Sequence, residues 1–415
     1  MRRCVVILIG LAVAGTYASR AAAQSTDVAA LTAQLEALMQ VVETQASQIS
    51  ALQATVGAVA APISESDTNT SVGLNALDSL TTGTKNSAFG QDALTATTTG
   101  EKNGALGYGA LYSNTTGNKN MAVGFEALYT NTSGIDNAAL GYQALYSNTT
   151  GSNTTGTGSY ALFSNTTGEK NGANGYGALY YNTTGSWNMA VGYQALFSNT
   201  EGNYNMASGY QALYTNTTGS FNLAGGYRAL YKNTTGIHNT GQGAYALYST
   251  TPGSYNTASG YAALRNNTTG DYTTASGGVA LYANTTGAFY SAAGTYALRN
   301  NTTGSYNTAV GYATGYSNQT GSGNVFLGYQ AGYSETGSNT LYIANSDTSS
   351  PMIYGDFSSN AVTINGSLTV TGSCSGCLQG FEGLFATQMA QYTSAASTTT
   401  TNVVTTTTAP GANLT

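Results

Sequence analysis

A glycine recurs every 17 residues through most of the chain, and this fixed period constrains the fold more than any other feature. One set of glycines runs from Gly83 to Gly321, and a second runs from Gly73 to Gly328 in 16 copies without an insertion or deletion. A unit of 17 residues cannot bury a core alone, whereas stacked copies bury one continuously. The sequence therefore predicts a mainly β fold, a β-solenoid of 17-residue repeats over residues 69–332.

The shared phrase, G-S-x-N-x-A-x-G-Y-x-A-L-Y-x-N-T-T, indicates which side chains face inward. The part N-x-A-x-G alternates, which predicts a short strand with its alanine inward. The part Y-x-A-L-Y fits either a strand that meets a corner or a short helical turn. N-T-T-G is typical of a turn, because Asn and Gly tolerate left-handed conformations.

A leucine follows the second glycine by four positions in 14 of the 16 copies, and Gly315 and Gly332 replace it in the last two. Because every copy has the same length, these leucines should lie in line and form the repeat core. The core leucines are predicted to be Leu111, Leu128, Leu145, Leu162, Leu179, Leu196, Leu213, Leu230, Leu247, Leu264, Leu281 and Leu298.

A different pattern precedes the repeats. Apolar residues alternate steps of three and four at Val28, Leu31, Leu35, Leu38, Val42, Ile49, Leu52, Val56 and Val59. This heptad pattern predicts an α-helical coiled coil over residues 27–60. Gln45 is the polar residue of the seam and a candidate for fixing register or oligomeric state. An amphipathic helix packed on a globular domain is the alternative.

The two ends of the chain carry processing and low-complexity signals. Two arginines, a short apolar run and three alanines predict a secretory signal peptide over residues 1–23, with a membrane anchor as the alternative. Residues 333–377 read as a β-rich collar, and residues 378–415 read as a short helix and a Thr-rich tail. Because export permits disulfides, Cys374 and Cys377 are predicted to form a structural one, either between chains or within a local loop.

The composition argues against catalysis and against metal or cofactor binding. Charged residues make up 7% of the chain, and His238, the single histidine, occupies a slot that varies between copies. A Ser-His-Asp or Cys-His arrangement would have to use that residue. Acidic residues are scattered, whereas a Ca²⁺-binding β-roll needs recurrent Asp in its turns. With a net charge of −6 and no basic run, we expect no catalysis, no cofactor, no metal and no nucleic-acid partner.

The N-x-A-x-G phrase with a following G-x-x-A resembles the head repeats of trimeric autotransporter adhesins. In that family each chain forms a left-handed β-roll and three rolls pack around one axis, so the resemblance implies a homotrimer. The segment that begins NVFLGYQAGYSETG at Asn324 is similar to a region of phage-tail-fibre-like surface proteins. Many such chains cleave themselves with a Ser and a Lys, but Lys232 is the last lysine here, so that chemistry is not carried over.

These patterns together predict a secreted or cell-surface fibrous protein that acts in adhesion or surface presentation without catalysis. Its partner would be a glycan or a protein on a host or other surface. The tyrosines that follow the second glycine and the leucine would either stabilise the rod or bind that partner. A structural fibre shaft is the alternative function, and binding of ice or another surface by a threonine array is a further one.

Overall fold

The computed structural model describes residues 25–59 and 69–368. It divides the chain into two compact units that meet between Thr68 and Asn69. Several predicted features lie outside the described residues: the signal peptide over 1–23, Cys374, Cys377, and the helix and tail over 378–415.

The first unit contains one helix, α2 (Ser25–Val59). The seam residues Leu38, Val42 and Ile49 have exposed fractions of 59%, 56% and 58%, and Gln45 is exposed as well. The helix therefore presents an apolar seam that no other described residue covers. Within the described ranges, no helix is both long and apolar enough to cross a membrane.

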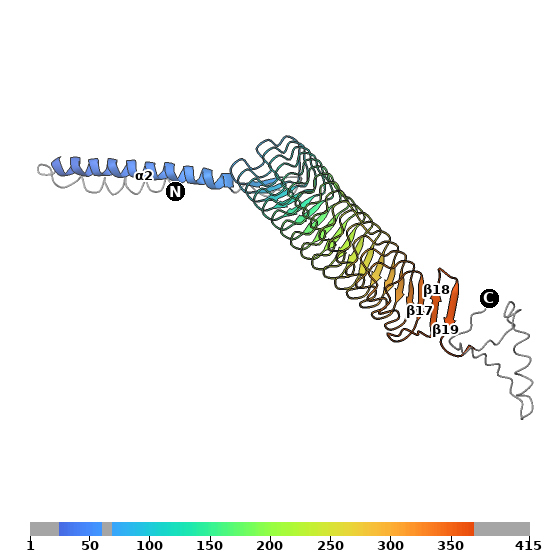
Figure 1. The fold of residues 1–415 in the computed structure, drawn as a ribbon. Helices are drawn as coiled ribbons and strands as arrows, with labels where there is room; N and C mark the ends of the chain where they lie inside the picture. Colours follow the sequence, from blue (N-terminus) through green and yellow to red (C-terminus); the bar gives the residue numbers. More distant parts are fainter. Residues whose placement is uncertain (1–24, 60–68, 369–415) are drawn as a thin grey trace, which may run out of the picture. The chain divides into compact units, whose positions relative to one another are not determined.

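The second unit is a stack of coils, one for each repeat (Figure 1). Each coil contributes one short strand, which pairs in parallel with the strand of the next coil, so that Ala105 lies opposite Ala122. The strands of the repeats are β1 (Thr70–Val72), β2 (Ser87–Phe89), β3 (Gly104–Leu106), β4 (Met121–Val123), β5 (Ala138–Leu140), β6 (Thr155–Thr157), β7 (Gly172–Asn174), β8 (Met189–Val191), β9 (Met206–Ser208), β10 (Leu223–Gly225), β11 (Thr240–Gln242), β12 (Thr257–Ser259), β13 (Thr274–Ser276), β14 (Ser291–Ala293), β15 (Thr308–Val310) and β16 (Val325–Leu327). The predicted β-solenoid with its 17-residue spacing is confirmed.

Three further strands end the stack. β17 (Thr340–Ile343) still pairs in parallel with β16, but with Val325 opposite Leu341 the step is one residue shorter. β18 (Ile353–Asp356) and β19 (Ala361–Ile364) then pair antiparallel. The change of direction closes the sheet with a hairpin in place of another coil.

The core consists of three parallel columns, two of alanine and one of leucine. The central alanine of nearly every strand is buried, and all twelve leucines of the predicted core are fully buried. Because these residues recur at the same place in every coil, each leucine lies between its equivalents in the coils before and after it.

The Y-x-A-L-Y half of the repeat is neither a strand nor a helical turn, which corrects both alternatives left by the sequence. It is a series of turns in which the leucine adopts a left-handed backbone, with φ of 52° at Leu128. The residue two places earlier, Glu126, is left-handed too, with φ of 51°. This conformation costs about 1–2 kcal/mol for a non-glycine residue. Burial and the bond from the Leu128 N–H to the carbonyl of Ala144 (2.9 Å) offset that cost.

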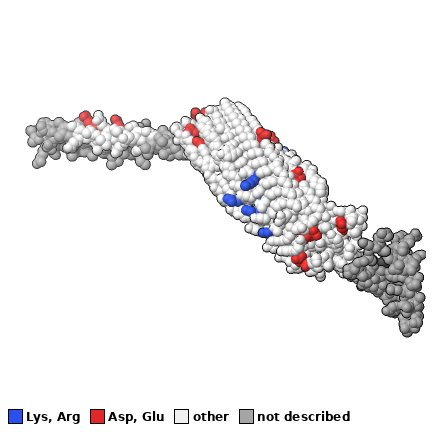
Figure 2. All heavy atoms as spheres, viewed as in Figure 1, with Lys and Arg blue, Asp and Glu red and all other residues white. Residues whose placement is uncertain are grey.

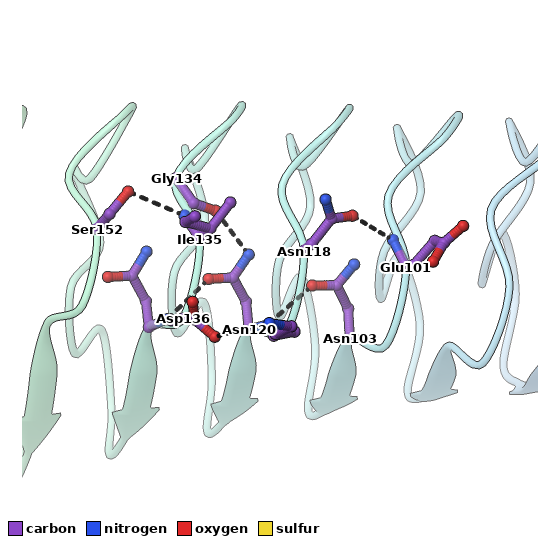
Figure 3. A network of polar contacts seen from close by, with 10 residues as sticks. Glu101, Asn103, Asn118, Asn120, Gly134, Ile135, Asp136 and Ser152 are labelled. Atoms are coloured by element: carbon purple, nitrogen blue, oxygen red, sulfur yellow. Dashed lines mark hydrogen bonds and ion pairs between the residues drawn. The ribbon is translucent and has the colours of Figure 1, made fainter.

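Two ladders of buried asparagine run the length of the rod beside this core. In the first ladder the asparagine directly precedes the strand in most coils (Figure 3). The Asn120 N–H donates to the Asn103 side-chain oxygen (2.9 Å), and Asn120 Nδ2 donates to the carbonyl of Gly134 (2.7 Å). Asn120 Oδ1 accepts in turn from the Asn137 N–H (3.0 Å), so both polar atoms of the side chain bond the next coil and the polar interior is satisfied.

The second ladder uses the asparagine of N-T-T-G. Asn216 Nδ2 donates to Asn199 Oδ1 (2.7 Å) and to the carbonyl of Gly219 (2.9 Å), and the next coils repeat the arrangement. Threonine replaces this asparagine at Thr97 and Thr250, and both buried hydroxyls have no hydrogen-bond partner in the described part of the chain. The amide is therefore the group that this position requires.

Tyr290 interrupts the second ladder. It takes the place of an asparagine of the first ladder, and its buried hydroxyl donates to Asn301 Oδ1 (2.6 Å). Asn301 consequently donates to Asn318 (3.3 Å) instead of Asn284, whose side-chain oxygen is left without a partner. Burial raises the pKa of the Tyr290 hydroxyl well above its usual range.

The two copies that lack the core leucine are filled from a neighbouring strand. β16 carries Phe326 where the other strands carry a small residue, and its ring is fully buried. A Cβ on Gly315 would lie 2.6 Å from that ring, and a Cβ on Gly332 would also overlap it. The Phe326 ring therefore fills the space that leucine side chains at positions 315 and 332 would otherwise occupy.

We expect Thr250→Asn to stabilise the rod by about 1 kcal/mol, because the new amide can donate to Asn233 and accept from Asn267. The measurement is the midpoint of urea unfolding. Thr235→Asn is the matched control, since Thr235 is exposed at the turn, and it should leave the midpoint unchanged. A lower midpoint for Thr250→Asn would contradict the ladder.

Phe326→Ala should lower the free energy of unfolding by about 3–5 kcal/mol, because it leaves a cavity. Adding Gly315→Leu and Gly332→Leu to it restores the usual repeat and should recover most of the loss. Denaturant unfolding of the single and triple variants tests this. A triple variant no more stable than Phe326→Ala would show that the three positions are not coupled.

Candidate functional surface

The described residues hold no cluster suited to metal binding. No group of three or more His, Cys, Asp or Glu lies close enough to hold a metal ion within residues 25–59 and 69–368. His238 is exposed and stacks between Phe221 and Tyr255, with ring centroids 4.8 and 4.9 Å away. The His238 ring thus takes part in a stack of aromatic side chains. The surface of the rod is instead organised into rows of aromatic side chains.

The strand-end row consists of the residue after the second glycine. Its members stack face to face, as in Tyr193 on Tyr210, with centroids 5.2 Å apart and planes within 8°. All are at least 41% exposed. The row comprises Tyr108, Phe125, Tyr142, Tyr176, Tyr193, Tyr210, Tyr227, Tyr261, Tyr312 and Tyr329.

Three copies carry their tyrosine one position later, at Tyr160, Tyr245 and Tyr296. The displaced ring still reaches the strand-end row, but edge-on. Tyr245 lies at 71° to Tyr227 and at 90° to Tyr261. Tyr160 and Tyr245 each bridge a gap in the row with T-shaped contacts, which aromatic rings favour, whereas Tyr296 contacts Tyr312 on one side of its gap.

The leucine-end row consists of the residue after the core leucine. Nine rings from Tyr112 to Tyr248 stack in one run, each half-buried. Burial, followed by the neighbouring Tyr231, raises the pKa of the Tyr214 hydroxyl. Beyond Tyr248 the row alternates arginine with tyrosine, beginning with Arg265 over Tyr248 and Tyr282.

The turn row was missed by sequence reasoning. It is the slot of His238, and from Trp187 to Tyr306 every copy places a ring there. The eight rings stack without a break, and Lys170 covers the free face of Trp187 at 4.0 Å. The signal was in the sequence, since an apparently variable slot was aromatic in eight consecutive copies. The row comprises Trp187, Tyr204, Phe221, His238, Tyr255, Tyr272, Phe289 and Tyr306.

The stacking decides what these rows can bind. Because each ring covers the face of the next, the rows present ring edges and hydroxyl groups to solvent. A sugar that needs the flat face of an aromatic ring would find it occupied. The rows therefore offer repeated edges and hydroxyl groups, and their main effect is to stabilise contact between coils.

The outward face of the sheet changes character along the rod. The first coils expose apolar side chains, among them Val72, Leu106 and Met121 at 50–56%. In later coils the first strand position carries hydroxyl groups, as at Thr257 and Thr274. The first threonine of N-T-T-G is used differently, since Thr115 Oγ1 donates to the carbonyl of Thr132 (3.0 Å).

No protein-family description, curated protein or solved structure matches the chain.

We expect Tyr245→Gln to lower the free energy of unfolding by about 0.5–1.5 kcal/mol, because the gap between Tyr227 and Tyr261 reopens. Adding Ala244→Tyr places the ring where most copies have it and should recover the loss. Thermal unfolding of both variants measures the effect. If Ala244→Tyr gave no recovery, the displaced tyrosine would not be a member of the row.

Proposed function

We propose that the chain is an exported, fibrous surface protein that acts in adhesion or in the presentation of a surface, without catalysis. The observation that carries this proposal is the repetition of each outward position, coil after coil, along a rod. Any contact that one coil makes can be made again by the next. Weak contacts of this kind gain strength through multivalency.

The proposal includes a homotrimer held by a coiled coil of α2. The exposed seam of Leu38, Val42 and Ile49 supports it, since an isolated helix gains nothing from an apolar seam in water. The apolar coils at the start of the rod, with Val72 and Leu106, give further surface for contact between copies. Export through the predicted signal peptide belongs to the same proposal.

A structural shaft is the second candidate, and the continuous interior favours it. The asparagine ladders and the alanine and leucine columns stabilise length and stiffness whatever the surface binds. The outward hydroxyl groups of β12 and β13 support the further candidate, in which a threonine array binds ice or another surface. In that array Ser259 and Ser276 take the second outward place of each strand, so the surface is only partly threonine.

Deleting whole repeats separates adhesion from a shaft. Removal of residues 171–238 or of residues 103–170 deletes four coils and keeps the register of the rest. On beads coated with the protein, adhesion predicts that attachment to a panel of glycan-coated and protein-coated surfaces falls with the number of coils.

The two deletions are matched in length and differ in the surface that they remove. An equal loss would indicate sites spread along the rod, and an unequal loss would indicate a local one. Attachment that either deletion leaves unchanged, or no attachment by the full chain, would favour the shaft. Circular dichroism confirms that each shortened rod is folded.

A further inference from the structure

The later coils of the rod gather basic residues on one face. The basic strip is defined by Arg228, Lys232, Arg265 and Arg299. Figure 2 shows a group of basic side chains in the middle of the visible face of the rod, without acidic side chains among them. The chain as a whole has more acidic than basic residues, so this grouping is a local departure.

Tyrosine rings join the members of the strip. Arg265 lies 5.5 Å from the centroid of Tyr248 and 5.6 Å from that of Tyr282. Arg299 continues the row, 5.6 Å from Tyr282 and 5.7 Å from Tyr316. Beyond Tyr248 a guanidinium group therefore replaces every second ring of the leucine-end row and lies between the neighbouring rings.

Arg228 and Lys232 extend the strip towards earlier coils. Arg228 lies 5.3 Å from the ring of Tyr231, and Lys232 lies 5.7 Å from the ring of Tyr248. Both tyrosines belong to the stacked run of the leucine-end row. Lys232, Arg265 and Arg299 are thus linked through shared rings, and Arg228 is joined to them by the stacking of Tyr231 on Tyr248.

The strip keeps its charge uncompensated. Arg228 Nε donates to Gln211 (3.0 Å) and Arg265 Nη1 to the hydroxyl of Tyr282 (2.8 Å). Arg299 Nη1 donates to Asn300 (3.0 Å) and to Tyr316 (3.3 Å). All these acceptors are neutral, and no carboxylate of the described residues forms an ion pair with the strip. Since each guanidinium has five N–H donors, several remain for an anionic ligand.

The spacing of the strip selects the ligand. Its cations belong to the coils of Gly226, Gly260 and Gly294, which follow one another at every second coil. The first of these coils carries both Arg228 and Lys232, whereas Arg265 and Arg299 occupy the same place in the other two. At about 4.8 Å between coils, one cationic coil follows another by about 10 Å along the rod. A strand of nucleic acid carries a phosphate every 3.4 Å or so, about three for each cation. A chain with more widely spaced anions matches the strip better.

We propose that the basic strip binds a linear acidic polysaccharide that lies along the rod and carries a carboxylate on alternate sugars. An extended pyranose chain advances by roughly the height of one coil per sugar, so every second sugar meets an arginine. Tyrosine hydroxyl groups between the arginines bond the intervening neutral sugar. This inference rests on the proposed adhesive function and gives it a ligand class.

The test uses the full chain and hyaluronate oligosaccharides, in which alternate sugars carry a carboxylate. Arg265→Tyr with Arg299→Tyr removes two charges and restores the ring that most copies have, so the rod should stay folded. We expect affinity to fall about tenfold or more, because two charge-assisted contacts are lost. Dextran, which is neutral, should not bind, and binding of hyaluronate should weaken as salt increases.

Lys102→Gln with Lys119→Gln is the matched control. It removes the same number of charges from the early coils, outside the strip, and should change the affinity less than about twofold. Equal binding by the wild type and the arginine variant would overturn the inference. So would tighter binding of single-stranded RNA than of hyaluronate, which would assign the strip to nucleic acid.

The outcomes also separate this inference from the proposed function. If hyaluronate does not bind but the repeat deletions still reduce attachment to other surfaces, the ligand class is wrong and adhesion stands. If the deletions leave attachment unchanged and hyaluronate binds through the strip, the strip is a local site on a shaft. Failure of both tests overturns both proposals.

Discussion

The hydrogen bonding of each coil to its equivalent in the next coil is the constraint on which the rest of the structure depends. Backbone groups pair along the strands and through the turns, as in the bond from Leu94 N to the carbonyl of Ala110 (3.0 Å). The coils are then only about 4.8 Å apart, so each side chain must tolerate a copy of itself at that distance. Asparagine, tyrosine, alanine and leucine meet this condition, because amides bond amides, rings stack and small apolar groups pack.

The same condition explains the scarcity of charge. A column of like charges at this spacing would repel itself, so most charged residues have neutral equivalents in the adjacent coils; Lys85, Lys102 and Lys119, which share one slot in three successive coils, are an exception. Glu126 accepts from Gln143 (2.7 Å), and Arg228 donates to Gln211 (3.0 Å). In the leucine-end row the arginines are separated by tyrosine. The composition of the chain is thus a consequence of its packing.

Much of the interior could be predicted from the sequence, because an unbroken period places equivalent residues in line. The strand at N-x-A-x-G and its inward alanine follow from alternation alone. The left-handed leucines could not be predicted, since leucine seldom adopts that backbone and only the bonds between coils, as at Leu128, make it acceptable. The exchange between Phe326 and Gly315 was visible only as two unexplained departures from the repeat. The turn row was hidden because its slot varies in chemistry while remaining aromatic.

The departures from the repeat are therefore where a rod of this kind can carry specific information. A uniform coil gives every partner the same surface, and its length sets only the number of contacts. Arg265 and Arg299 alter that surface without breaking the row, because a planar guanidinium takes the place of a ring. Phe326 and Tyr290 alter the interior and must be accommodated by neighbours. Selection on binding can act on the first kind of change at little structural cost, so a specific site on this rod should lie in its surface rows.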